Sequence, residues 1–204
     1  MTEKSPFVNL HTHSPKVGEP TIQCVGIHPW QAEEHNLANP DERKALEAEV
    51  ATAQAVGEIG LDFAAEVDRE AQRELFVAQL KLAKKHKKVV VLHCVKAFEP
   101  TMQSLSTFPL RGVIFHGFIG SMQQMNEAVE RGYYISFGER TFASPKTLRA
   151  LRECPLERLF IESDTSSTPI EEIYEMISKQ RMESVEELRE AIFENYKRLN
   201  PTVE

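Results

Sequence analysis

The sequence predicts an α/β fold built on a parallel sheet, and two features of the chain support this prediction. Short apolar runs rich in β-branched or aromatic residues alternate with longer segments of helical periodicity, as in repeated β-α units. Each run is followed by Gly, Ser, Thr or another polar turn residue, as buried parallel strands usually are. The predicted strands cover residues 7–11, 22–27, 54–60, 88–93, 111–116, 133–137 and 158–163.

Segments between the strands each offer one apolar stripe that can pack on a sheet. The stripes are Leu46, Val50 and Ala53, then Phe76, Leu80 and Ala83, then Met122, Met125 and Val129. The last helix has the clearest start, because Ser184 and Glu187 have the spacing of a capping box. An apolar face that runs from Leu188 to Leu199 follows this box.

The connection between the first two strands is too short for the repeating pattern. Only residues 14–21 separate them, and these include Pro15, Gly18 and Pro20. A parallel crossover with its helix needs about 10–12 residues or more. The two strands are therefore joined without a helix or are not direct neighbours, and we expect residues 14–21 to be exposed and without regular secondary structure.

Composition favours one domain over residues 1–204 and argues against a surface that coats nucleic acid. The hydrophobic content of 41% suffices for one core, and no Pro/Gly-rich linker divides the chain. Lys and Arg number 24 and Asp and Glu 31, which gives a net charge of −7. Because non-specific nucleic-acid affinity comes mainly from basic side chains, this balance argues against an extended nucleic-acid-binding surface. A small molecule or a nucleic-acid end is the expected substrate, and a monomer is favoured, with the oligomeric state left open.

Cysteine usage and the absence of long apolar runs predict a cytoplasmic protein. Cys24, Cys94 and Cys154 are odd in number and form no C-x-x-C pair, which is typical of reduced thiols. The start of the chain has no apolar signal core. Apolar runs stay well below the ~18 residues of a membrane span, so no membrane partner is expected.

Histidines and carboxylates at the ends of the apolar runs predict a metal-dependent enzyme. They are His11, His13, Glu58, His93, His116 and Asp164. Reactive groups gather at the carboxyl ends of parallel strands, and imidazoles with carboxylates suit a divalent transition metal. Taken singly, each residue has a simpler interpretation: a hydrogen-bonded core histidine, a solvated one, a helix cap or an ion-pair partner. Together they favour the metal, because a shared cation removes the cost of burying isolated charges.

Short motifs along nearly the whole chain support a more specific interpretation. In order, they are 11–13 (His-Thr-His), 26–29 (Gly-Ile-His-Pro), 58–62 (Glu-Ile-Gly-Leu-Asp), 93–94 (His-Cys), 115–121, 134–138, 162–164 (Glu-Ser-Asp) and 194–199. In these motifs the chain resembles the TatD family of metal-dependent hydrolases, within the amidohydrolase-like TIM barrels. The resemblance implies a TIM-barrel-like parallel barrel that is reduced to about seven strands. One early β-α unit is missing, which accounts for the short connection at residues 14–21.

The resemblance also implies a two-metal site with divalent cations such as Zn²⁺, Mg²⁺, Mn²⁺ or Ni²⁺. His11, His13 and Asp164 would hold one ion, and His93 and His116 the other. Glu58 would bridge the two ions, and Asp164 would also accept a proton, so that these two carboxylates are the expected catalytic residues.

The implied activity is hydrolysis of phosphodiester bonds, as in a deoxyribonuclease that acts from a 3′ end. The same site chemistry also suits an ester, a lactone or an amide, including an aminoacyl-tRNA ester, and a non-catalytic barrel is a further alternative. The chain departs from the family pattern at Asn9, where the family has Asp, and at Val95, where it commonly has Arg. His28, Trp30 and Lys96 are the expected substrate-binding residues, with Trp30 serving as a stacking face or as a lid.

Overall fold

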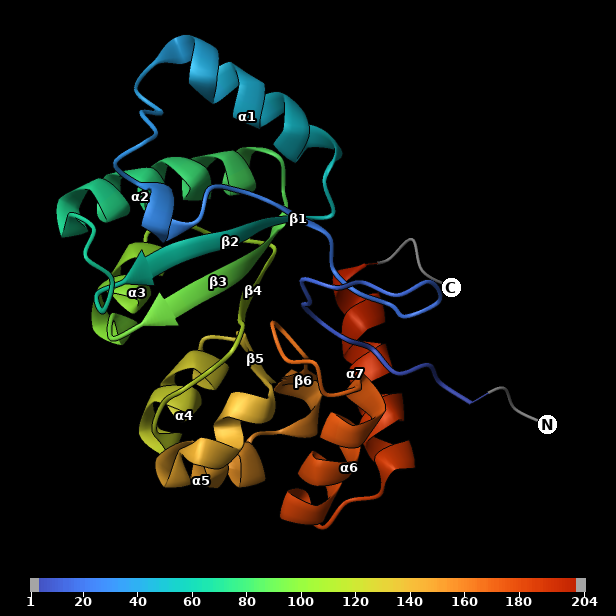
Figure 1. Cartoon of the computed structure of the whole chain (residues 1–204). Coiled ribbons are helices and arrows are strands. Elements are labelled where there is room, and N and C mark those ends of the chain that lie inside the picture. The colour runs from blue at the N-terminus through green and yellow to red at the C-terminus, as the bar shows by residue number, and fades with distance from the viewer. Residues whose placement is uncertain (1–3, 201–204) are drawn as a thin grey trace. The chain divides into compact units, whose positions relative to one another are not determined.

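The computed structural model describes residues 4–200, which form two compact units (Figure 1). Unit 1 contains the described residues up to Ile22 and from His116 onward, and unit 2 spans Gln23–Phe115. The first three residues of the start segment considered above lie outside the described part of the chain. One domain over residues 1–204 stays a prediction.

Unit 2 holds four parallel strands in the order β1-β2-β3-β4. They are β1 (Cys24–Val25), β2 (Ala55–Asp62), β3 (Val89–Val95) and β4 (Gly112–Phe115). Three α-helices accompany them, α1 (Pro40–Thr52), α2 (Arg69–Lys85) and α3 (Phe98–Leu105), together with the short 3₁₀-helix η1 (Pro29–Gln31). The four strands predicted here are confirmed, although the first is shorter than expected.

Unit 1 holds the parallel pair β5 (Tyr134–Phe137) and β6 (Leu159–Ile161). Its helices are α4 (Met122–Glu130), α5 (Pro145–Glu153), α6 (Ile170–Arg181) and α7 (Val185–Leu199), and Figure 1 shows α6 and α7 side by side. Two 3₁₀-helices, η2 (Glu139–Ala143) and η3 (Leu156–Arg158), precede α5 and β6. The predicted capping box of Ser184 and Glu187 starts α7 as expected.

The strand predicted over residues 7–11 is the main difference between sequence and structure. This segment is not a regular strand, but the Leu10 N–H donates to the Ile161 carbonyl of β6 over 3.0 Å. On its other side, the Asn9 N–H donates to the Pro20 carbonyl and the Ile22 N–H donates to the Leu10 carbonyl. A longer ladder cannot build there, because Pro20 has no N–H to donate. The described chain therefore has six regular strands instead of seven.

Residues 14–21 have no helix or strand, as the sequence predicts, and most of them are exposed. Among the described residues, no helix is both long and apolar enough to cross a lipid bilayer.

Candidate metal clusters

In unit 1, four of the predicted residues come together beside the end of β6. His11, His116 and Asp164 offer ligand atoms that all lie within 4.8 Å of one another. His13 joins them, with its Nε2 3.4 Å from Asp164 Oδ1. His11 and His116 are buried, whereas more than half of the His13 side chain is exposed. This set, called the Asp164 cluster below, opens to solvent on the His13 side.

Backbone pairing explains why these side chains converge. The Asp164 N–H donates to the His11 carbonyl (3.0 Å), and the His13 N–H donates to the Asp164 carbonyl (3.1 Å). Asp164 is thus held between the two histidines in a left-handed conformation, with φ of 52°. Because side chains two apart on an extended segment share a face, His11 and His13 both reach this carboxylate, as their spacing predicts.

Glu162, a residue without a predicted role, orients His116. This carboxylate is fully buried, accepts a hydrogen bond from the Gly117 N–H (2.6 Å) and lies 3.2 Å from His116 Nδ1. Burial raises the pKa of Glu162, but the charge and hydrogen bond of His116 and the charge of His11 outweigh it, so this pKa lies below its ordinary value. With Nδ1 engaged, His116 turns Nε2 toward the cluster, a common arrangement around metal-binding histidines.

Unit 2 holds a second set of donors, which lie within β2 and β3 and shortly after β1. His28, Glu58 and His93 offer ligand atoms within 4.8 Å of one another, and His93 Nδ1 is 3.7 Å from Glu58 Oε2. The His28 and His93 rings meet edge to face at 4.4 Å. His28, for which a substrate role was expected, is therefore a member of this set, called the Glu58 cluster below.

Asp62 orients a histidine in unit 2, as Glu162 does in unit 1. Its Oδ2 lies 3.0 Å from His93 Nε2 and accepts a hydrogen bond of 2.8 Å from Trp30 Nε1. Burial opposes ionisation of Asp62, but the hydrogen bonds from Trp30 and His93 outweigh it and hold its pKa below the ordinary value. The sequence spacing could have indicated that both residues face their clusters. Asp62 lies four positions after Glu58 and Glu162 two positions before Asp164, and side chains an even number of residues apart on a strand share a face.

Two buried glutamines of α2 fix the backbone around the Glu58 cluster. The Gln79 side chain accepts from the Ile27 N–H (2.7 Å) and donates to the Ile27 carbonyl (2.9 Å), next to His28. Two helical turns earlier, the Gln72 side chain makes the same two hydrogen bonds to the backbone of Asp62, at 2.7 and 3.0 Å. Residues seven apart share a helix face, so α2 positions both segments.

Gly60 shows why the Glu-Ile-Gly-Leu-Asp motif carries a glycine. The two strands approach so closely at this point that a Cβ on Gly60 would lie 2.0 Å from the His93 carbonyl oxygen. Its φ of 145° is also one that other residues rarely adopt. Gly60 therefore lets β2 and β3 bring Glu58, Asp62 and His93 together.

Asn9, where the family pattern has Asp, fits the shortened connection of this chain. Its Nδ2 donates to Glu19 Oε1 (2.7 Å) and to Ser163 Oγ (2.8 Å), and its Oδ1 accepts from the Ser163 N–H (2.9 Å). An aspartate would place a second carboxylate against Glu19 in a buried position. The Asn9 amide avoids this repulsion, and its two hydrogen bonds to Ser163 hold the residue that precedes Asp164.

The remaining predicted substrate residues lie in unit 2. Trp30 is 58% exposed and meets the His28 ring edge to face at 4.6 Å, so its indole covers the Glu58 cluster. Lys96 follows β3 directly, is exposed, and forms no ion pair with any residue in the described range 4–200.

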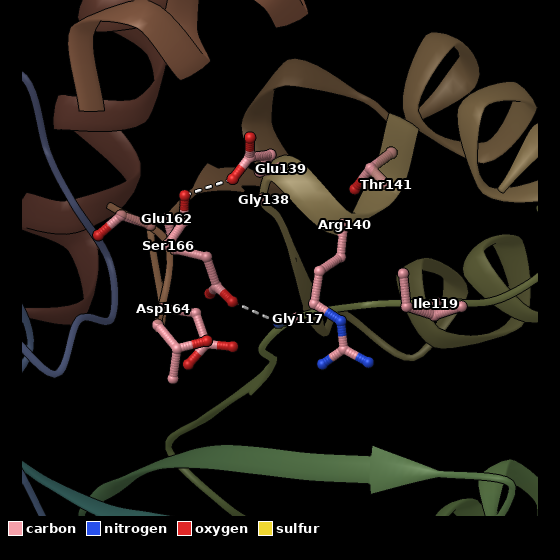
Figure 2. A pocket seen from close by; sticks show the side chains of 11 residues that line it. Gly117, Ile119, Gly138, Glu139, Arg140, Thr141, Glu162, Asp164 and Ser166 are labelled. Carbon is pink, nitrogen blue, oxygen red and sulfur yellow. Dashed lines mark hydrogen bonds between the residues drawn. The ribbon is translucent and has the colours of Figure 1, made fainter. Parts of the chain in front are cut away.

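A small pocket adjoins the Asp164 cluster within unit 1 (Figure 2). It has a volume of about 170 Å³, and Gly117, Arg140, Glu162, Asp164 and Ser166 are among its lining residues. The catalytic candidate Asp164 thus faces a space that a substrate group can enter.

The donor sets of both clusters fit a divalent cation. Each combines at least two imidazoles with one carboxylate, a nitrogen-oxygen set that Zn²⁺, Mn²⁺ and Ni²⁺ accept. A further buried carboxylate, Glu162 or Asp62, orients one histidine of each cluster, as expected around metal ligands.

Comparison with known proteins agrees with this geometry. Residues 7–200 match the family model described as TatD related DNase. An uncharacterized metal-dependent hydrolase, YjjV of Escherichia coli strain K12, is 32% identical over 197 residues, which cover 87% of this chain and 75% of that protein. The crystal structure of YjjV superposes with a TM-score of 0.78 over 88% of this chain and 76% of its own. The predicted α/β, barrel-like fold in reduced form is thereby confirmed.

A relative with a named activity matches a shorter part. The 3′-5′ ssDNA/RNA exonuclease TatD of Citrobacter rodentium is 34% identical over 147 residues, 69% of this chain but only 55% of that enzyme. The chain therefore spans little more than half the length of this exonuclease.

Proposed function

This chain belongs to the TatD-related DNase family and is a hydrolase, and on that premise we propose that it cleaves phosphodiester bonds at the ends of DNA strands. The observation that carries the proposal is the pair of donor clusters, each with its own carboxylate and its own orienting carboxylate. Nuclease names among the relatives support phosphorus over carbon as the electrophile.

We propose that each cluster holds one divalent cation. His11, His13, His116 and Asp164 would hold one, and His28, Glu58 and His93 the other. Bound cations would supply Lewis-acid stabilisation of phosphate charge and a more acidic water. This assignment moves His116 from the second ion to the first and adds His28, whereas the bridging role of Glu58 stays a prediction.

The protein's own groups have separate tasks in this scheme. Asp164 faces the pocket and accepts the proton of the attacking water. Glu162 and Asp62 keep His116 and His93 in the tautomer and orientation that ligation needs. Trp30 is held by the hydrogen bond from its Nε1 to Asp62 and presents an exposed ring face on which a terminal base can stack.

A substrate panel tests the proposal. Metal-loaded protein with Mg²⁺, Mn²⁺, Zn²⁺ or Ni²⁺ would be given a single-stranded oligonucleotide, bis(p-nitrophenyl) phosphate, a p-nitrophenyl carboxylate ester, a lactone and an amide. We expect cleavage of the two phosphodiesters, with mononucleotides released from the 3′ end of the oligonucleotide. Turnover of an ester, lactone or amide with intact phosphodiesters would reject phosphodiester hydrolysis and leave the family assignment standing.

A further inference from the structure

Among the described residues, one basic side chain lines the pocket beside Asp164, and it is not paired with a protein carboxylate. Arg140 is the only basic side chain among the eleven lining residues, all of them in the described part of the chain. Its guanidinium forms no hydrogen bond or ion pair with any residue between 4 and 200. Figure 2 shows the side chain extending from η2 toward Gly117.

The carboxylates that line the same pocket are already engaged. Glu139 accepts hydrogen bonds from Ser166 Oγ and from Thr168 Oγ1 (3.1 Å), and Figure 2 shows it turned to Ser166, away from Arg140. Glu162 binds His116 and the Gly117 N–H, and Asp164 belongs to the metal cluster. A guanidinium that faces a cavity without a protein partner is suited to an anion from outside, above all to a phosphate oxygen pair.

The size of the pocket limits what enters it. Small-molecule sites usually enclose about 300–1,000 Å³, whereas this pocket encloses about 170 Å³. It therefore accommodates one substituent of a substrate, such as a single phosphate group, while the rest of the substrate stays outside.

From these observations, and resting on the proposed function, we infer that Arg140 forms a subsite for a second phosphate of the substrate strand, next to the scissile phosphodiester. Asp164 lines the same pocket, so a phosphate bound by Arg140 holds the strand beside the reacting group. Arg140 is then a specificity residue that favours substrates with a neighbouring phosphate over an isolated phosphodiester.

Dithymidine substrates test this subsite. The dinucleotide TpT has only the scissile phosphate, whereas pTpT and TpTp add one phosphate on the 5′ or the 3′ side. We expect the wild type to cleave at least one phosphorylated dinucleotide about tenfold better than TpT, measured as kcat/KM, because a charge-assisted bond is gained. Arg140→Gln should abolish this preference and leave TpT cleavage within about twofold.

Two further variants make the test specific. Arg149→Gln removes an exposed arginine of α5 outside the pocket and should keep the full preference. Arg140→Lys should keep part of it, because lysine retains the charge without the planar fork. Where TpT is cleaved, the subsite is rejected if neither added phosphate improves cleavage, or if Arg140→Gln keeps the preference.

Binding separates this inference from the proposed function. If no dinucleotide is cleaved, the affinity for pTpT and TpTp is measured by calorimetry with the metal-loaded proteins. A loss of about tenfold in Arg140→Gln, absent in Arg149→Gln, would retain the phosphate subsite and reject only the proposed reaction. Equal affinities would overturn the subsite.

Discussion

Asp164 is the residue on which the candidate site of unit 1 depends. Its backbone is bonded to both His11 and His13, and its carboxylate faces His13 Nε2 at 3.4 Å. The left-handed backbone at this position is one that Asp and Asn tolerate better than other non-glycine residues. An Asn substitution is thus a mild structural change that removes the negative charge.

Asp164→Asn should reduce kcat/KM on a single-stranded oligonucleotide by at least about a hundredfold, because it removes the proposed metal ligand and the proposed proton acceptor together. Thermal unfolding should be nearly unchanged in metal-free protein, since the backbone bonds remain. Asp41→Asn, at an exposed position of α1, is the matched control and should keep full activity. Normal turnover by metal-loaded Asp164→Asn would show that this carboxylate has neither role.

The cysteines allow a separate test at the residue scale. Burial raises the pKa of the Cys24 and Cys154 thiols to about 12 and that of Cys94 to about 11. A raised pKa means less thiolate at a given pH, so at pH 8 the native protein should react with Ellman's reagent about a hundredfold more slowly than the unfolded chain. A thiol that reacts in the native state as fast as free cysteine would contradict the burial described here.

At the scale of elements, α2 connects the helical layer of unit 2 to its donor cluster. Gln72 and Gln79 satisfy backbone groups of Asp62 and Ile27 that no strand pairs. Substitution of Gln79 by Ala leaves the buried N–H and carbonyl of Ile27 without partners. We expect a loss of about 2–4 kcal/mol in the free energy of unfolding, measured by urea denaturation.

Gln103→Ala is the matched control for that measurement. Gln103 is an exposed glutamine of α3, in the same unit, and its side chain forms no hydrogen bond within the described residues. Its removal should leave the free energy of unfolding unchanged within about 0.5 kcal/mol. Equal losses in both variants would show that the Ile27 bonds contribute nothing specific.

Most elements follow from local sequence, and the exceptions have physical reasons. Strands β2 to β6 and the α7 capping box were predictable, because apolar runs and caps act within a few residues. The sequence of residues 7–11 predicts a strand, but Pro20 and the short connection prevent a regular hydrogen-bond ladder along it. The hydrogen bonds of Gln72 and Gln79 join segments that are distant in the sequence, and periodicity does not reveal such contacts.

The candidate site was predictable in its residue types more than in its grouping. Spacing placed His11 and His13 on one face, and both do reach Asp164. By contrast, His116 lies with His11 and Asp164, and His28 with Glu58 and His93. This grouping depends on which strands lie side by side, and that cannot be predicted from the spacing of residues in a single sequence.

At the scale of the whole molecule, net charge sets how the substrate is held. A charge of −7 gives the chain little long-range attraction for a polynucleotide, so under the proposed function we expect few and local contacts to phosphate. For single strands, each neutralised phosphate contributes a slope of about −0.7 to log K against log salt. With about two or three such contacts, we expect a slope no steeper than about −2 for oligonucleotide binding. A slope of about −5 would reveal an extended basic surface, against the expectation from composition.

The central claim is that this chain hydrolyses phosphodiesters with one cation in each donor cluster. Metal titration tests it most directly: Mn²⁺ is added stepwise to metal-stripped protein, and bound metal and cleavage of a 5′-labelled single-stranded oligonucleotide are measured at each step. The expected result is no cleavage without metal and a maximal rate when about two ions are bound per chain, with Asp164→Asn and Glu58→Gln each binding one ion fewer. An oligonucleotide that stays intact with two ions bound would contradict the claim.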